Sequence, residues 1–369
     1  MKSSLRCRSC QKKYPSSEPR WKCHCGGFLT VDFHARFPIK LIRKRKPTLW
    51  RYREALPIHQ NQSIVSFDEG FTPLTKEEVY GKHVWLKQDF LFPSGSYKDR
   101  GASVLVSKMK ELGLKNAVED SSGNAGAAIA AYCAKASITS HIYVPKKTSA
   151  GKLLQIQQYG AKLHRVQGNR KDAADAAWQH AQTTYYASHY WNPYFFQGTK
   201  TCVFEIVEQL GWTPPDVLIV PVGNGTLLYG SYLGLKELQQ EGIIDKLPRI
   251  IGIQAKNCAP LAAAWKNNNI IKPVTSSKET IAEGIAISNP TRAEDILHSV
   301  RETSGDILTV TENEILNALY YIRKKGYYIE PTSAVTIAGL KKLSIKENDC
   351  VVIPLTGNGL KTKPRHDET

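Results

Sequence analysis

Residues 216–228 read Asp-Val-Leu-Ile-Val-Pro-Val-Gly-Asn-Gly-Thr-Leu-Leu, an apolar run that ends in two glycines before a helical pattern of apolar residues begins. A continuous apolar run of this kind is typical of a strand buried on both faces of a parallel sheet. Glycines let the backbone approach an anion closely, and N–H groups at a helix start point toward it. The stretch predicts an α/β fold with a phosphate site at Gly223, Asn224, Gly225 and Thr226; a plain strand-to-helix turn is the alternative.

Two common nucleotide sites do not match this loop. Leu228 occupies the third glycine position of the dinucleotide fingerprint, so that fingerprint fails. The chain also has no G-x4-G-K-[ST] sequence, which excludes ATP or GTP bound on a P-loop.

Strand-like and helix-like segments alternate from about residue 68 to the end of the chain. Strands are expected at 83–87, 140–144, 161–166, 216–222, 249–254, 307–310 and 350–355. Helices are expected near 99–112, 124–136, 149–159, 170–183, 199–210, 226–241, 258–267, 312–325 and 332–343. Thr311 and Glu314 form a capping box for the 312–325 helix, which Gly326 would end. The alternation predicts parallel sheets covered by helices.

A loop of small residues, Pro93-Ser-Gly-Ser-Tyr-Lys-Asp-Arg-Gly101, runs into a predicted helix. Lys98 stands at the start of that helix, where the helix dipole disfavours a cation. The same field lowers the pKa of the amine and favours the free base that forms a Schiff base. A solvent-facing lysine is the ordinary alternative.

Two further loops have the placement at strand ends where α/β proteins collect ligands. Asp120-Ser-Ser-Gly-Asn124 opens a helix of small residues: Ser121 and Ser122 suit a carboxylate, and Asn124 suits a phenolic oxygen. Thr356 ends the apolar run 351–355 and precedes Gly357. The alternative interpretation of the 120–124 loop is a capped helix without a ligand, and that of Thr356 is an ordinary turn residue.

Size and composition limit the classes of protein to which the chain can belong. The chain has 369 residues, with 41% hydrophobic and 22% charged, enough for two domains and a small appendage. The N-terminus is polar, and no apolar run reaches the length that spans a bilayer. We therefore expect a cytoplasmic protein with no membrane partner.

The net charge of +17 raises the question of nucleic acid. Only residues 36–53 concentrate basic side chains, and the other lysines are scattered. A lysine-rich solvated surface explains the charge, so no nucleic-acid partner is expected; attraction of anions stays the alternative.

Four of the eight cysteines, Cys7, Cys10, Cys23 and Cys25, are spaced C-x2-C-x12-C-x-C. Two close pairs of thiolates can surround one tetrahedral Zn²⁺, and four protein ligands would make it structural. The second pair, Cys23 and Cys25, has one intervening residue instead of two, which weakens the match to a zinc-binding pattern. His24 could replace a neighbouring thiolate as a ligand. A ribbon that keeps its thiols without metal is the alternative.

Taken together, these segments resemble the fold-type II pyridoxal 5′-phosphate (PLP) enzymes, and within them the threonine synthases. The resemblance covers nearly the whole chain. Its motifs are the Cys-rich N-terminus, LWRY (49–52), EGFTPL (69–74), SGSYKDRG (94–101), SSGNAG (121–126), GAKLHRVQGN (160–169), NPY and GTKT (within 192–201), GNGT (223–226), EPTSA (330–334) and TGNGLK (356–361).

The resemblance implies a role for each candidate residue. Lys98 would form the Schiff base and move protons, and Asn124 would bond the 3-oxygen of the cofactor. The glycine loop would hold the phosphate, and Thr356 would face the pyridine nitrogen, where a neutral hydroxyl suits elimination more than transamination. Ser121 and Ser122, with Asn124, would bind the substrate.

Three positions depart from the family pattern. Ala125 replaces a threonine, Tyr190 a serine and Phe195 an arginine. Loss of an arginine from a phosphate pocket removes charge and geometry together. We therefore hypothesise a threonine synthase-like lyase whose substrate is less anionic than O-phosphohomoserine.

The resemblance also implies an architecture and leaves two rivals. We expect a zinc-ribbon-like segment at 1–34, a large PLP-binding domain at 35–102 and 205–369, a small mobile substrate domain at 103–204, and a homodimer. One rival is β-replacement or dehydration of a serine- or threonine-type substrate, as in cysteine or cysteate synthases. The other is a non-catalytic zinc-ribbon protein that binds nucleic acid.

Overall fold

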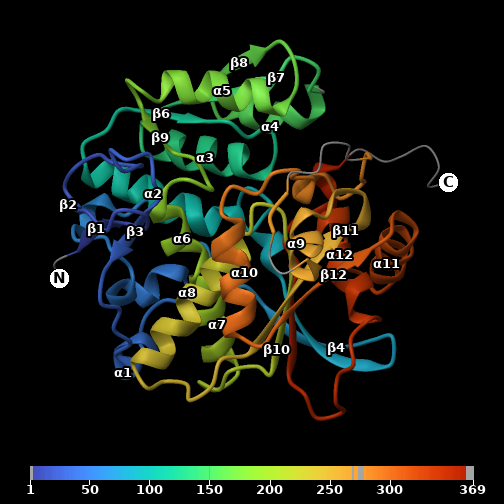
Figure 1. Cartoon of the computed structure of the whole chain (residues 1–369). Helices are drawn as coiled ribbons and strands as arrows, with labels where there is room; N and C mark the ends of the chain where they lie inside the picture. Colours follow the sequence, from blue (N-terminus) through green and yellow to red (C-terminus); the bar gives the residue numbers. More distant parts are fainter. Residues whose placement is uncertain (1–2, 149, 268–269, 273–277, 363–369) are drawn as a thin grey trace. The chain divides into compact units, whose positions relative to one another are not determined.

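The computed structural model describes residues 3–148, 150–267, 270–272 and 278–362 (Figure 1). By packing, the chain forms two compact units. Unit 1 comprises Met1–Gly70 and Phe92–Thr201, and unit 2 comprises Phe71–Leu91 and Cys202–Thr369. In the described part of the chain, no helix combines the length and the apolar character needed to cross a bilayer.

Unit 2 is built on a six-stranded sheet in the order β12-β11-β10-β13-β5-β4. The strands are β4 (Leu74–Val79), β5 (Lys82–Lys87), β10 (Val217–Pro221), β11 (Arg249–Ala255), β12 (Asp306–Val310) and β13 (Val351–Pro354). All neighbouring pairs are parallel except β4 with β5. Every residue of β10 is buried, as the apolar run of its sequence predicts.

Helices cover this sheet. They are α7 (Thr201–Gln209), α8 (Thr226–Gln240), α9 (Pro260–Lys266), α10 (Ala293–Glu302), α11 (Glu312–Lys324) and α12 (Pro331–Leu340). The predicted capping box is confirmed: the Glu314 N–H donates to Thr311 Oγ1 at 3.3 Å, and the Thr311 N–H donates to Glu314 Oε2 at 2.7 Å. Gly326, with φ of +91°, follows the helix as expected.

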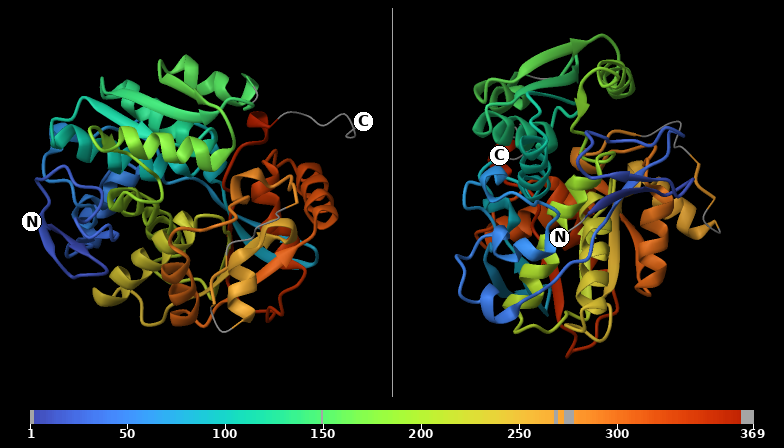
Figure 2. Two further views of the ribbon diagram at one scale, coloured as in Figure 1. Left: turned by 45° about the horizontal axis from the view of Figure 1, so that its top comes forward. Right: turned by 90° about the vertical axis from the view of Figure 1, so that its left-hand side faces the viewer.

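Unit 1 contains a four-stranded parallel sheet in the order β8-β7-β6-β9. Its strands are β6 (Asn116–Glu119), β7 (Thr139–Pro145), β8 (Lys162–Val166) and β9 (Tyr185–Tyr186). Its helices are α1 (Ile39–Ile42), α2 (Lys98–Glu111), α3 (Asn124–Lys135), α4 (Ala150–Gln158), α5 (Arg170–His180) and α6 (Pro193–Thr199). Helix α5 packs on β7, which can be followed in both views of Figure 2. Residue 149 of the expected 149–159 helix lies outside the described residues.

The Cys-rich N-terminus forms an antiparallel sheet in the order β2-β1-β3, with β1 (Ser4–Cys7), β2 (Lys13–Pro15) and β3 (Leu29–Asp32). Trp21 of this ribbon contacts three aromatic rings of the same unit edge-on, with centroid distances of 4.8 Å to Trp178, 5.0 Å to Tyr186 and 5.9 Å to Trp191. Aromatic burial therefore anchors the ribbon to the α/β part of unit 1.

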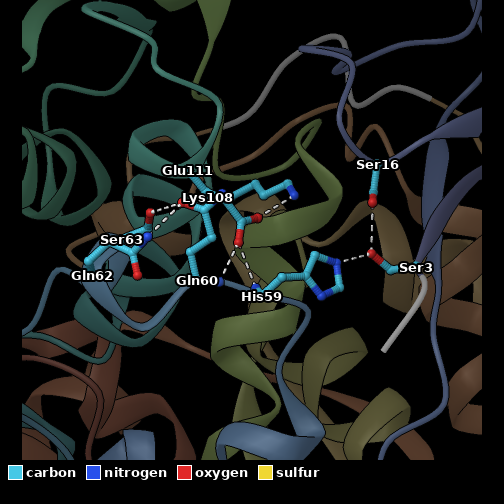
Figure 3. A network of polar contacts seen from close by, with 8 residues as sticks. All are labelled: Ser3, Ser16, His59, Gln60, Gln62, Ser63, Lys108 and Glu111. Carbon is cyan, nitrogen blue, oxygen red and sulfur yellow. Dashed lines mark hydrogen bonds and ion pairs between the residues drawn. The ribbon is translucent and has the colours of Figure 1, made fainter.

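A polar network joins the connector, residues 33–70 after the ribbon, to helix α2 (Figure 3). Ser3 Oγ lies 2.9 Å from His59 Nε2. The backbone N–H groups of His59 and Gln60 donate to Glu111 Oε1 at 2.6 and 2.8 Å. The other oxygen of Glu111 lies 2.6 Å from Lys108 Nζ. Charge-assisted hydrogen bonds thus hold the connector to the end of α2.

The boundaries of the units differ from those of the predicted domains. Residues 35–70 and 92–102 pack within unit 1, whereas the prediction grouped them with 205–369. The reason is α2, which packs against α3 and α6 and keeps its flanking segments beside them. The assignment of a cofactor domain and a mobile substrate domain stays a prediction.

Candidate cofactor and substrate site

The glycine loop of unit 2 joins the end of β10 to the start of α8. Gly225 has φ of +70°, a left-handed conformation that favours glycine. A Cβ atom at Gly225 would lie 2.3 Å from Ile296 Cδ1, and one at Gly223 would lie 2.8 Å from Ile285 Cα. Both positions therefore require glycine, and α8 begins at Thr226 with its N–H groups facing the loop, as a phosphate site needs.

Thr356 lies at the end of β13, the parallel neighbour of β10, so both loops lie at one edge of the sheet. Its side chain is 1% exposed. Ser333 Oγ accepts hydrogen bonds from the N–H groups of Thr356 at 2.9 Å and Gly357 at 3.0 Å, and lies 2.9 Å from Thr356 Oγ1. Because a hydroxyl has two acceptor lone pairs, Ser333 must donate to Thr356 Oγ1. The Thr356 proton is then directed to another acceptor, such as a ring nitrogen.

Lys98 is the first residue of α2 in unit 1. Its Nζ lies 4.9 Å from the centre of the Tyr97 ring and 5.5 Å from that of Phe195. The loop before it is held in place because the Ser94 N–H and hydroxyl both donate to the buried Asp99 carboxylate. The amine therefore stands against aromatic faces at a well-anchored helix start.

The predicted substrate loop follows β6 directly. Ser121 is buried and Ser122 half-buried, and α3 begins at Asn124. A Cβ at Gly126 would lie 1.9 Å from the Ser121 carbonyl oxygen, so the loop packs tightly on the first turn of the helix. The loop thus has the strand-end position that the sequence predicts.

The sequence interpretation assigned no role to two acidic residues at this strand end, Glu119 and Asp120. Asp120 Oδ1 accepts a hydrogen bond from Tyr186 at 2.8 Å, and Oδ2 accepts one from Tyr190 at 2.9 Å. Glu119 Oε1 lies 2.7 Å from His189 Nδ1. The signal was present, because an acidic pair directly before Ser-Ser-Gly-Asn lies at the same strand end.

The electrostatics of these groups involve Lys98. Burial raises the pKa of the Glu119 carboxyl well above its ordinary value, the Asp120 charge adds to the rise, and the Lys98 charge opposes it. Burial lowers the pKa of His189 well below its ordinary value, and the Lys98 charge lowers it further. Unit 1 therefore brings Lys98 within electrostatic reach of the end of β6.

The four N-terminal cysteines lie together in the ribbon. Their sulfur atoms are all within 4.8 Å of one another, and both the Cys7–Cys25 and the Cys10–Cys23 pair are 3.5 Å apart. A tetrahedral ion with zinc–sulfur bonds of about 2.3 Å puts its sulfurs about 3.8 Å apart. The four thiols therefore fit a structural zinc ion. His24, whose Nε2 lies 2.9 Å from Arg20, takes no part in this cluster.

We expect the purified protein to carry about one zinc ion per chain, because four converging thiolates bind it far more tightly than buffer does. Elemental analysis of wild type and Cys10→Ser tests this, with Cys350→Ser, outside the cluster, as the matched control. The variant should lose the metal and the control should keep it. Equal metal contents in all three proteins would show that the cluster binds none.

The comparisons with known proteins identify the family. Residues 65–357 match the family model described as pyridoxal-phosphate dependent enzyme. The threonine synthase of Methanocaldococcus jannaschii is 38% identical over 96% of this chain and 92% of its own length. The threonine synthase of Mycobacterium leprae is 37% identical over 84% of this chain and 87% of its own.

Solved structures share the fold. Maize serine racemase has a TM-score of 0.69 and 22% identity, covering 85% of this chain and 94% of its own. The processed form of threonine deaminase isoform 2 from Solanum lycopersicum has a TM-score of 0.68 and 20% identity, covering 85% of this chain and 86% of its own. These likenesses confirm the predicted fold class. The chain belongs to the family of pyridoxal-phosphate dependent enzymes, as a lyase of the threonine synthase type.

Proposed function

We propose that the protein performs elimination or replacement on an amino-acid substrate, with Lys98 as the residue that attaches PLP and moves protons at Cα. The observation that carries the proposal is the position of Lys98 at the first residue of α2, within electrostatic reach of buried Glu119 and His189. In a PLP-dependent family, an amine at a helix start is the group suited to this attachment.

The chemistry of the residues fits the cofactor. Lys98 supplies an amine for its aldehyde, and the loop from Gly223 to Thr226 supplies backbone N–H groups for its phosphate. Thr356, which Ser333 leaves as a donor, suits a ring nitrogen, and Asn124 suits the ring oxygen. When bound, PLP supplies an electron sink for negative charge at Cα.

Each residue then has a defined task. The Lys98 amine removes the proton at Cα and returns it to the product. Ser121 and Ser122 bind the substrate carboxylate and orient Cα. Because the Thr356 hydroxyl is oriented as a donor, it would suit an unprotonated ring nitrogen of PLP, and an unprotonated ring would favour elimination over transamination.

Within this chemistry, the alternative to the threonine synthase reaction is β-replacement or dehydration of a serine- or threonine-type substrate. One observation favours it: the neighbours of Lys98 and Ser121 include the Phe195 ring, 5.5 Å from Lys98 Nζ, and the Asp120 carboxylate, which directly precedes Ser121, and neither carries a positive charge. Formation of threonine from O-phosphohomoserine is the reaction of the threonine synthases. A cytoplasmic homodimer that binds no nucleic acid remains a prediction.

A substrate series tests the proposal. The holoenzyme is given O-phosphohomoserine, O-acetylserine, O-phosphoserine, serine and threonine, and the release of phosphate, keto acid and threonine is measured. We expect turnover of at least one substrate that follows cofactor content. A cofactor-loaded protein that converts none of them, and whose visible spectrum does not respond to them, would rule the proposed function out.

A further inference from the structure

We propose that the buried carboxylate of Asp120, held between Tyr186 and Tyr190, determines substrate specificity: it selects a side chain that is a non-anionic hydrogen-bond donor, a hydroxyl or an ammonium, and rejects a phosphate. The inference rests on the proposed function and adds the substrate class.

Asp120 is held rigidly at the end of β6. It is 6% exposed, and Tyr186 and Tyr190 each donate to one of its oxygens, at 2.8 and 2.9 Å. The next residue in the chain is Ser121, the first residue of the proposed substrate-carboxylate loop. The Asp120 carboxylate is therefore one residue from the backbone that would position the substrate.

Aromatic rings connect Lys98 to this carboxylate. The Phe195 ring centre lies 5.5 Å from Lys98 Nζ, and the His189 ring lies 6.1 Å from that of Phe195. The Tyr190 ring lies 4.9 Å from that of His189, and its hydroxyl donates to Asp120. The three rings between Lys98 and Asp120, those of Phe195, His189 and Tyr190, thus include no arginine or lysine that could hold a phosphate group.

The chemistry of a carboxylate decides which side chains fit. An ionised carboxylate only accepts hydrogen bonds, and two tyrosines occupy one site on each oxygen of Asp120, which leaves further acceptor sites. A hydroxyl or ammonium can donate to those sites. A phosphate dianion cannot, and its charge is repelled strongly because the carboxylate is buried away from water.

Arg170 is the nearby cation that could oppose this selection. It is exposed at the first residue of α5. Burial raises the pKa of Asp120 above its ordinary value, and the hydrogen bonds of Tyr186 and Tyr190 and then the charge of Arg170 oppose the rise. In our inference Arg170 helps to keep Asp120 ionised. The opposing hypothesis is that Arg170 itself binds an anionic substrate, so the experiment includes the variant Arg170→Gln.

The experiment uses two matched series: serine, 2,3-diaminopropionate and O-phosphoserine, and homoserine, 2,4-diaminobutyrate and O-phosphohomoserine. Kd is read from the change in cofactor absorbance of the holoenzyme, and kcat/KM from keto-acid release. We expect wild type to prefer the hydroxyl or ammonium member over the phosphate by about 100-fold, and Asp120→Asn to narrow that ratio at least about tenfold.

Matched variants keep the test specific. Asp175→Asn, on the exposed face of α5, should leave the ratio unchanged, as should Tyr320→Phe at an exposed tyrosine. Tyr190→Phe removes one donor to Asp120 with little change in shape, and should weaken the preference if Asp120→Asn does not fold. Cofactor absorbance and circular dichroism report folding for each protein.

The outcomes separate the two proposals. If wild type binds the phosphate member as well as the others, or if Arg170→Gln weakens phosphate binding tenfold or more, the inference about Asp120 is overturned and the proposed function stands. If no member of either series binds or reacts, and threonine and O-acetylserine are not converted either, the proposed function fails and the inference fails with it.

Discussion

Replacing Lys98 by alanine is expected to abolish covalent attachment of PLP and to lower turnover by about 10³-fold or more, because the amine is both the attachment point and the proton carrier. Borohydride reduction followed by peptide mass spectrometry measures the attachment, and keto-acid release measures the turnover. Wild type should show the cofactor mass on the peptide that contains Lys98, and the variant should show none.

Lys110→Ala is the matched control, because Lys110 lies on the same helix α2 and is exposed. It should keep both attachment and turnover. Added small amines should restore part of the activity of Lys98→Ala and none of the covalent attachment to protein. Cofactor bound covalently to another lysine in the variant would remove the central role that we assign to Lys98.

The second large effect concerns stability. Lys87→Met is expected to lower the free energy of unfolding by about 3–5 kcal/mol, the usual result of removing one partner from a buried ion pair. Lys87 of β5 and Glu205 of α7 are both 0% exposed, and Lys87 Nζ lies 2.7 Å from Glu205 Oε2. Lys87 Nζ also donates to Thr72 O at 2.7 Å and Gln209 Oε1 at 2.8 Å. Urea unfolding measures the loss.

Two further variants serve as controls for the Lys87→Met prediction. Lys246→Met removes the ion pair between Lys246 and Asp216, in which the lysine side chain is 70% exposed. This variant should change the free energy of unfolding by less than about 1 kcal/mol. The double variant Lys87→Met/Glu205→Leu should recover most of the loss, because apolar side chains of similar volume replace a buried pair well. A single variant as stable as wild type would mean that the buried pair contributes nothing.

Strands with long apolar runs were predictable from the sequence, and short polar strands were not. β10 and β13 appear where the apolar runs place them. β6 was missed because Asn116-Ala-Val-Glu119 has only two apolar residues, too few for a periodic pattern. It forms a strand because it pairs with β7 on one side and β9 on the other. This missed strand carries Glu119 and leads directly into Asp120.

The acidic end of β6 shows that local sequence patterns do not predict contacts between distant segments. An acidic pair in a sequence is ordinarily a solvated face, so the place of Asp120 directly before Ser-Ser-Gly-Asn was the only sign of a role for it. Tyr190 donates to it across 70 residues of sequence, and only the pairing of β6 with β9 brings their segments together. The Thr356 hydroxyl is similar, since Ser333, 23 residues before it, orients its proton.

The sequence by itself determined the family, the cofactor, the glycine loop and the ribbon, because each depends on residues close together in the chain. Glycines at a strand-to-helix turn, a lysine at a helix start and paired cysteines keep their chemistry in any such local setting. The surroundings of Lys98 were decided by tertiary structure alone. Lys98 starts α2, Asp120 follows β6, and His189, Tyr190 and Phe195 come from the stretch that runs into α6; packing brings Phe195 against Lys98 and Tyr190 against Asp120.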